Sequence, residues 1–168
     1  MNLAVDVHYQ GDDRAVAAGI LFADWASDVI ARRETVTLSD IAPYEPGAFF
    51  KRELPCILAL LEAFGETPRI IVIDGYVTLG ADRRDGLGAH LHRALGQAVP
   101  VIGVAKTAFA GTPAGTEVLR GGSRRPLYVT SIGIDHGEAK RLIRTMHGAH
   151  RLPTVLNAVD RACRGAVA

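Results

Sequence analysis

The first third of the chain carries three hydrophobic runs that are separated by turn-forming residues. The turns fall at the Gly-Asp-Asp of residues 11–13 and the Ala-Ser-Asp of residues 26–28. Apolar runs bounded by such clusters are typical of strands. We therefore predict three consecutive strands, joined as an antiparallel meander, over residues 3–9, 16–25 and 29–38.

The spacing of apolar residues then becomes helical. Residues 48–64, which follow Pro43 and Pro46, place large apolar side chains at the spacing of an amphipathic helix of about four turns. From residue 70 the pattern becomes that of an α/β protein. Residues 70–73 form a continuous branched apolar run, as in a strand that is buried on both faces.

The remaining chain repeats these two patterns. Strands are predicted at residues 99–105 and 127–131, and helices at residues 86–95, 135–147 and 153–164. A meander followed by crossover connections predicts an α/β fold with one mixed sheet, in which antiparallel strands precede parallel strands and helices cover both faces.

Composition indicates one globular domain over residues 1–168, because 48% of the residues are hydrophobic. The longest apolar runs have about eight residues, whereas a membrane-spanning helix needs roughly 20. Asp6 interrupts the only apolar N-terminal stretch, so we expect no signal peptide. Two cysteines cannot form a disulfide framework, which favours a reducing compartment. We therefore expect a cytoplasmic protein that does not associate with membranes.

Charge is distributed unevenly along the chain. The net charge is +1, but residues 1–81 carry −6 and residues 82–168 carry +7. A partner must therefore be recognised locally and not by a global field. The basic loop at residues 120–125 includes Arg124 and Arg125, whose guanidinium groups match the geometry of phosphate. We expect these two arginines to contact a nucleic-acid backbone.

Three carboxylates and one lysine favour metal-assisted phosphoryl chemistry. Asp6 lies within one apolar strand and Asp74 directly follows another, where an ionised carboxylate loses hydration unless a cation compensates it. If the two strands are neighbours, both carboxylates emerge at the same part of the sheet and Glu53 approaches from the intervening helix. Such oxygen ligands favour Mg²⁺, with Mn²⁺ as the alternative, over Zn²⁺. Lys106 follows the strand at 99–105 and is suited to neutralise charge on a phosphate or its leaving oxygen.

Each of these residues also has a plainer interpretation. Asp6 alone fits a strand-end aspartate with satisfied hydrogen bonds, and Asp74 with Gly75 is a common turn. Glu53 alone fits a solvated helix residue, and two prolines often start a helix without any other role. Only the combination of the carboxylates with Lys106 favours a site.

Eight short segments occur in order along the chain. They are Asp6-Val7, Pro43-Tyr44-Glu45-Pro46-Gly47, Lys51-Arg52-Glu53, Val72-Ile73-Asp74-Gly75, Gly88-Ala89-His90-Leu91, Ile102-Gly103-Val104-Ala105-Lys106, Pro126-Leu127-Tyr128-Val129 and Arg151-Leu152-Pro153. No single segment is specific, but their order and spacing over residues 3–164 resemble the endonuclease V family.

The resemblance implies an RNase H-like fold and a metal-dependent endonuclease that hydrolyses a phosphodiester bond near a deaminated base, chiefly inosine. It implies that Asp6, Glu53 and Asp74 bind the metal and that Lys106 assists at the scissile phosphate. Family members place a metal-site histidine seven residues after the proline of the Arg-Leu-Pro segment. Here that position is Asp160, and a carboxylate also suits a hard cation.

The resemblance also implies residues that handle the base. Pro43, Tyr44 and Pro46 correspond to a stiff wedge in which Tyr44 stacks where the base was, so that the base turns out into a pocket. The loop after Asp74, with Gly75 and Tyr76, lines that pocket. We expect a monomer that acts on DNA, with RNA as the alternative.

Two alternative functions remain open from the sequence. Bulky Tyr76 and Val77 replace the small residues that the family usually has after this Asp-Gly pair. A nuclease whose substrate is not inosine is therefore one alternative, and a non-catalytic nucleic-acid-binding relative is the other.

Overall fold

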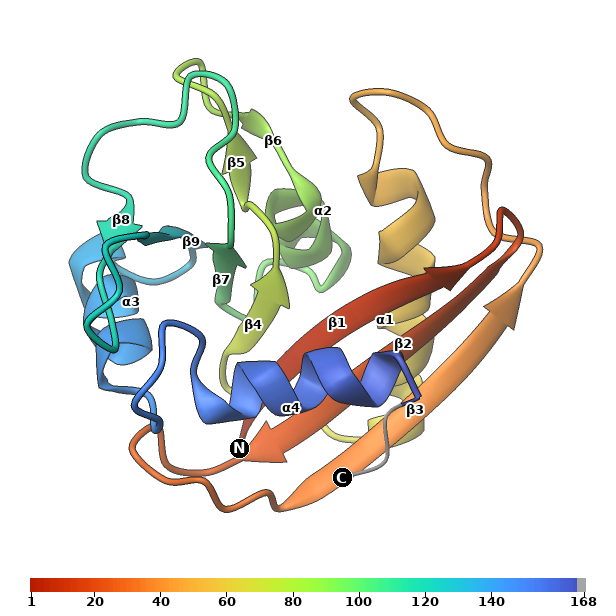
Figure 1. The fold of residues 1–168 in the computed structure, drawn as a ribbon. Helices are drawn as coiled ribbons and strands as arrows, with labels where there is room; N and C mark the ends of the chain where they lie inside the picture. The colour runs from red at the N-terminus through yellow and green to blue at the C-terminus, as the bar shows by residue number, and fades with distance from the viewer. Residues whose placement is uncertain (166–168) are drawn as a thin grey trace.

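The computed structural model, which describes residues 1–165, is built around a mixed sheet of seven strands with helices on both faces (Figure 1). The strand order is β3-β2-β1-β4-β7-β9-β8. The predicted α/β architecture is therefore confirmed. The order also places β1 beside the central strand β4, at the point where the antiparallel meander meets the parallel strands.

The meander consists of β1 (Asn2–Gln10), β2 (Arg14–Phe22) and β3 (Arg32–Ser39), paired antiparallel in sequence order. Two predicted boundaries were wrong. The second strand ends at Phe22 because the Asp24 carboxylate accepts a hydrogen bond from the Ala26 amide and turns the chain. The third strand begins at Arg32, since pairing with β2 starts only there and Val29 is 66% exposed.

The parallel strands bring the predicted carboxylates to one edge. β4 (Ile71–Asp74) runs parallel to β1, with Val5 opposite Ile73, and parallel to β7 (Val101–Ala105). Asp6 and Asp74 each follow this matched pair by one residue. The two aspartates therefore lie at the same level, where the β1–β4 pairing ends: Asp74 is the last residue of β4, whereas Asp6 is in the middle of β1. β9 (Leu127–Ile132) closes this side of the sheet antiparallel to β7.

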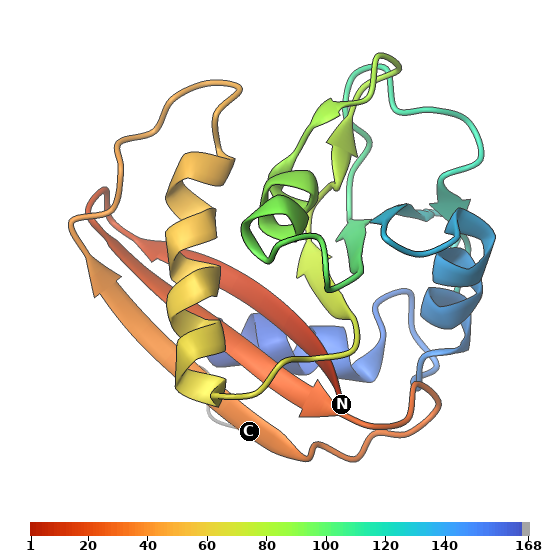
Figure 2. The same cartoon turned by 180° about the vertical axis from the view of Figure 1, so that it is seen from behind.

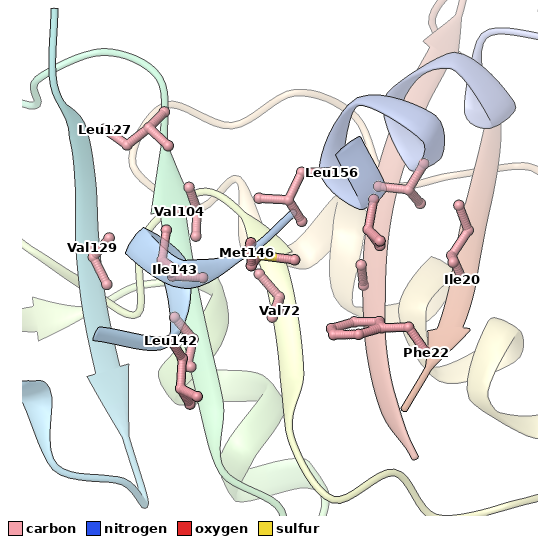
Figure 3. Packing of buried hydrophobic residues seen from close by; sticks show 14 of the residues in the cluster. Ile20, Phe22, Val72, Val104, Leu127, Val129, Leu142, Ile143, Met146 and Leu156 are labelled. Carbon is pink, nitrogen blue, oxygen red and sulfur yellow. The ribbon is translucent and has the colours of Figure 1, made fainter. Parts of the chain in front are cut away.

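Four helices form the two outer layers. α1 (Phe50–Phe64) and α2 (Leu87–Ala94) cover the face seen in Figure 2, and α3 (His136–Thr145) and α4 (Thr154–Cys163) cover the face seen in Figure 1. Each layer packs on its own hydrophobic cluster. Figure 3 shows the cluster beneath α3 and α4, in which Ile143, Met146 and Leu156 pack on strand residues such as Val72 and Phe22. Burying these side chains on both faces holds the sheet edge that carries the aspartates.

Three short strands were not predicted. β5 (Thr78–Leu79) and β6 (Arg84–Asp85) form a separate hairpin, and β8 (Glu117–Val118) pairs with β9. Two-residue strands are too short to show an alternating pattern, so the sequence carries no signal for them. The hairpin extends the loop after Asp74 away from the sheet, beside α1 and α2 (Figure 2).

Within residues 1–165, no helix combines the length and the apolar character that crossing a membrane requires.

Candidate active site

Three aspartates from three elements converge at the carboxyl edge of the sheet. Asp6 comes from β1, Asp74 from the end of β4 and Asp160 from α4, and one carboxylate oxygen of each lies within 4.8 Å of the others. Within residues 1–165, these three aspartates form the one group of at least three acidic, histidine or cysteine side chains that lie close enough together to hold a single ion. Asp6 and Asp74 were predicted from their strands, whereas Asp160 was named only through the family resemblance.

Lys106 joins this group from the end of β7. Its Nζ lies 2.8 Å from Asp74 Oδ2 and 3.2 Å from Asp160 Oδ1. Burial lowers the pKa of Lys106, but its hydrogen bonds and its attraction to these two carboxylates outweigh burial, so the pKa is raised above its usual value. The side chain is therefore held as a cation at the centre of the group.

Asp6 lacks such a partner. Burial, and next to it the nearby Asp74, raise its pKa, and Lys106 together with the Val7 amide, at 2.8 Å, offsets this only in part, so that the pKa is about 7. The carboxylate thus lies where negative charge is poorly compensated by protein groups. A bound cation is the direct way to stabilise its ionised form.

Glu53 lies on α1 and is 8% exposed, so its interpretation as a solvated helix residue was wrong. Burial, together with Asp6 and Asp74, raises its pKa to about 8, which places Glu53 within electrostatic reach of both aspartates. It is not part of the tight three-aspartate group. Glu53 instead lines a larger cavity together with Asp74.

Asp160 is stabilised by cations from two sides. Arg164, one turn later on α4, approaches its carboxylate at 3.1 Å, and Lys106 approaches from β7. Burial raises the pKa of Asp160, but the hydrogen bonds from Arg164 and Lys106 lower it below the usual value. Asp160 is therefore ionised and oriented toward the group.

A cavity of about 390 Å³ opens beside Asp74 and Glu53, between α1 and the loop that follows β4. It is lined mainly by aromatic and small residues: Tyr44, Gly47, Phe49, Phe50, Glu53, Asp74, Gly75, Tyr76, Leu79, Arg84, Asp85, Gly86, Leu87 and Phe109. Aromatic faces beside a polar edge suit a planar ring such as a nucleobase. The structure thus brings Tyr44, Gly75 and Tyr76, which the resemblance assigned to base handling, to one cavity.

The wedge segment forms an exposed loop before α1. Tyr44 is 63% exposed at the mouth of this cavity, and Pro43 and Pro46 are exposed on either side of it. Neither proline lines the cavity. The exposed tyrosine is therefore the member of the segment that is positioned to contact a ligand.

The loop after Asp74 lies against the sheet because two glycines permit it. Gly75 has φ +139°, a conformation that other residues rarely adopt. A Cβ at Gly103 of β7 would lie 2.6 Å from the Gly75 carbonyl oxygen and 2.8 Å from the Val77 nitrogen. Tyr76 then ties this loop to the one after β7, since its hydroxyl donates to the Thr107 carbonyl at 2.7 Å and accepts from the Phe109 amide at 3.2 Å.

Two arginines that hold the site together were missed. Arg151 donates hydrogen bonds to the carbonyl oxygens of Lys106, Arg125 and Pro126. Arg120 is 7% exposed and donates to five backbone carbonyls between α3 and α4, including that of Arg151. In the sequence, Arg151 stood out only through the Arg-Leu-Pro segment and Arg120 only through the basic loop at residues 120–125. Neither signal indicates this role, because bonds to backbone carbonyls require no particular partner residue.

The donor set fits a hard divalent cation. Three carboxylates converge, Asp6 is short of compensating charge, and no cysteine or histidine of residues 1–165 joins the group. Oxygen-only ligands of this kind are those of Mg²⁺ and Mn²⁺.

The strand order, with carboxylates where the β1–β4 pairing ends and a lysine and an aromatic cavity beside them, is the arrangement of an RNase H-like fold. The endonuclease V family model matches residues 2–152. Endonuclease V of Streptomyces coelicolor is 33% identical to this chain over 185 residues, covering 97% of the chain and 77% of the relative. Endonuclease V of Thermococcus kodakarensis is 34% identical over 165 residues, covering 96% and 77% respectively. The chain therefore belongs to the endonuclease V family.

Solved structures agree with this assignment. The crystal structure of endonuclease V from Streptomyces avermitilis matches with a TM-score of 0.78 at 30% identity, covering 98% of this chain and 79% of that one. Endonuclease V of Ciona intestinalis matches with a TM-score of 0.81 at 16% identity, covering 98% and 83%, a likeness in fold alone.

Proposed function

We propose that this single-domain protein is a Mg²⁺-dependent endonuclease that hydrolyses a phosphodiester bond near a deaminated base and so acts in nucleic-acid repair or processing. The convergence of Asp6, Asp74 and Asp160 within 4.8 Å, with Lys106 bonded to two of them, carries this proposal. The family membership supports it, because the relatives are endonucleases.

Asp6, Asp74 and Asp160 would hold the metal, with Glu53 assisting from the cavity side. When bound, Mg²⁺, or Mn²⁺ in its place, would supply an activated water and would stabilise charge on the leaving oxygen. Lys106 would bind a nonbridging oxygen of the scissile phosphate through the ammonium group that now contacts Asp74. Arg164 would keep Asp160 ionised and in place.

The aromatic cavity would receive the altered base. Tyr44 would stack in the vacated position at its mouth, supported by Pro43 and Pro46, while Gly75 and Tyr76 form the inner wall. The Ciona relative was crystallised with DNA that contains an inosine followed by a ribo-adenosine, which supports inosine as the base. DNA is the proposed substrate, and RNA is the alternative.

The Tyr76 ring favours a second candidate, a nuclease of the same mechanism for a different altered base. Its hydroxyl is already bonded to Thr107, so the ring occupies part of the cavity. A side chain as large as Tyr76 in the cavity wall would select among bases by their shape.

A panel of labelled oligonucleotides tests the proposal. DNA and RNA strands, each with and without one inosine, are incubated with the full chain and with Mg²⁺, Mn²⁺ or EDTA. We expect cleavage of inosine DNA with either metal and none with EDTA. The Asp74→Ala variant, which should remain folded, is the matched inactive control. Equal cleavage by wild type and this variant would refute the assignment, whereas cleavage without inosine preference would favour the second candidate.

We also place the protein in the cytoplasm. Cys56 and Cys163 are both buried free thiols, on α1 and α4, which suits a reducing compartment.

A further inference from the structure

A second, basic pocket continues from the active site on the side away from the aromatic cavity. It has a volume of about 270 Å³ and is formed by the segment after β7 and the segment before β9, with Lys106, Thr107, Arg124, Arg125, Tyr128 and Arg151 in its wall. Asp74 borders both the aromatic cavity and the aspartate group, and Lys106 borders both that group and the basic pocket. The three features therefore adjoin one another, with Asp74 and Lys106 as the residues that they share.

The charged side chains in the wall of the basic pocket are all positive. Arg124 and Arg125 are exposed, and within residues 1–165 neither has a carboxylate within ion-pair distance. Other exposed arginines of residues 1–165, such as Arg33 and Arg69, also lack a carboxylate partner, so Arg124 and Arg125 are distinguished by being adjacent in one pocket wall that also contains Lys106. Adjacent unpaired guanidinium groups repel each other, and an anion placed between them removes that repulsion.

Hydrogen bonds from Arg151 hold the backbone that forms the basic pocket. The Arg151 guanidinium lies 3.0 Å from the Arg125 carbonyl oxygen and 2.7 Å from that of Pro126, and it also donates to the carbonyl of Lys106. It thus joins the backbone of the catalytic lysine to the backbone that carries Arg125. The Ser123 hydroxyl further holds the loop by accepting from the Arg125 amide at 3.1 Å. A binding site whose backbone is held in this way needs little ordering when a ligand arrives.

We propose that this pocket binds the backbone phosphate that follows the scissile phosphate on the side away from the altered base. The inference rests on the proposed function, which places the base in the aromatic cavity and the scissile phosphate at Lys106. A strand that continues past Lys106 carries its next phosphate into the opening between Arg124 and Arg125. Their planar guanidinium groups can each donate two hydrogen bonds to phosphate oxygens. The pocket would thus fix the register of the strand without reading its sequence.

The test combines two changes: the two arginines are replaced in the protein, and the charge of one phosphate at a time is removed from the DNA. Single-stranded DNA with one inosine is prepared as a series, each member carrying one uncharged methylphosphonate at a successive position. Binding to the full chain is measured by fluorescence anisotropy with Ca²⁺ in place of Mg²⁺. The variants are Arg124→Gln with Arg125→Gln, and Arg69→Gln as a matched control, because Arg69 is exposed and precedes β4 at the opposite edge of the sheet.

For unmodified DNA, we expect the double variant to bind about tenfold more weakly, with a salt dependence reduced by the equivalent of about one phosphate contact. The informative position is the phosphate that follows the cleaved bond on the side away from the inosine. A methylphosphonate there should weaken binding by wild type about tenfold but should not change binding by the double variant. The control variant should respond like wild type at every position.

Equal losses for wild type and double variant at every position would overturn the inference, as would a coupled position on the base side of the cut. Cleavage of the unmodified strand by wild type with Mg²⁺ is scored separately. Cleavage without a coupled position refutes the pocket alone, whereas coupling without cleavage refutes the proposed endonuclease activity alone. Absence of both binding and cleavage refutes both.

Discussion

The ammonium group of Lys106 lies 2.8 Å from the carboxylate of Asp74, although the two residues are 32 positions apart and belong to separate strands. The parallel pairing of β4 with β7 creates this contact, because both side chains leave the sheet at its carboxyl edge. The same ammonium lies 3.2 Å from Asp160 on α4. One cation is therefore shared by two of the three aspartates proposed to hold a metal.

This position predicts that Lys106 acts on the phosphate and is not needed for metal binding. In Lys106→Met, we expect cleavage to fall about 10²–10³-fold because charge on the phosphate is no longer neutralised. The affinity for Mg²⁺ should stay equal or increase, since a competing cation has been removed from Asp74 and Asp160. Single-turnover cleavage and Mg²⁺ titration measure the two effects. Lys140→Met on α3 is the matched control, and a parallel loss of metal affinity would contradict the prediction.

Asp160 is predicted to act as a metal ligand in the position where the resemblance implies a histidine. Asp160→Asn keeps the size of the side chain but removes its charge, so we expect the Mg²⁺ concentration for half-maximal cleavage to rise about 10–100-fold. Asp160→His should retain metal-dependent cleavage, because imidazole is also a metal ligand. Isothermal titration with Mg²⁺ checks the affinity without relying on activity. Unchanged metal binding in Asp160→Asn would show that Asp160 only positions Lys106.

The residues of the candidate site differ in how far the sequence alone could identify them. Asp74 and Lys106 each stand at the end of an apolar strand and Asp6 interrupts another, so their type and position signal a site before the fold is known. Asp160 lies on a helix with no local signal, and only the packing of α4 across β1 and β2 brings it to Asp74 (Figure 1). Arg120 and Arg151 bind backbone carbonyls, which every residue has, so no pattern of side chains predicts their partners.

The fold prediction was correct where apolar residues are buried in a paired strand. It was wrong where apolar residues lie outside the paired region. Residues 71–73 of the predicted run are apolar and buried, and together with Asp74 they form β4. Val29 and Ile30 are also apolar, but they precede the point at which β3 pairs with β2, and they therefore form a connection. Apolar character alone does not show where a neighbouring strand ends.

The raised pKa of Asp6 predicts how stability depends on pH and metal. Its pKa is about 7 in the folded protein against an ordinary value of 3.8, so between these values the folded state holds a proton that the unfolded state releases. Without metal, stability should therefore fall as the pH rises through this window. Bound Mg²⁺ displaces that proton, so metal should bind more tightly at pH 8 than at pH 6.

Thermal melts with and without Mg²⁺ at these two pH values provide the measurement. At a Mg²⁺ concentration ten times the dissociation constant, binding adds about 1.4 kcal/mol, or roughly 3–6 °C in Tm. We expect this shift at pH 8 and a smaller one at pH 6. Asp74→Asn should abolish it at both values. A shift that is independent of pH would contradict the proposed role of Asp6.

Tyr44 is predicted to contribute to nucleic-acid binding and not to stability. Its ring is 63% exposed at the mouth of the aromatic cavity, so Tyr44→Ala should leave the Tm unchanged. Loss of the stacking face should weaken binding of an inosine-containing duplex about 10–100-fold, corresponding to about 1–3 kcal/mol for one stacked base. Tyr44→Phe keeps the ring and should bind like wild type. Val29→Ala removes an equally exposed apolar side chain, 66% exposed, from the connection before β3 and should change neither property. If Tyr44→Ala binds the duplex as tightly as Val29→Ala does, the exposed ring does not enter the stack, and another residue of the cavity must separate the base from its neighbours.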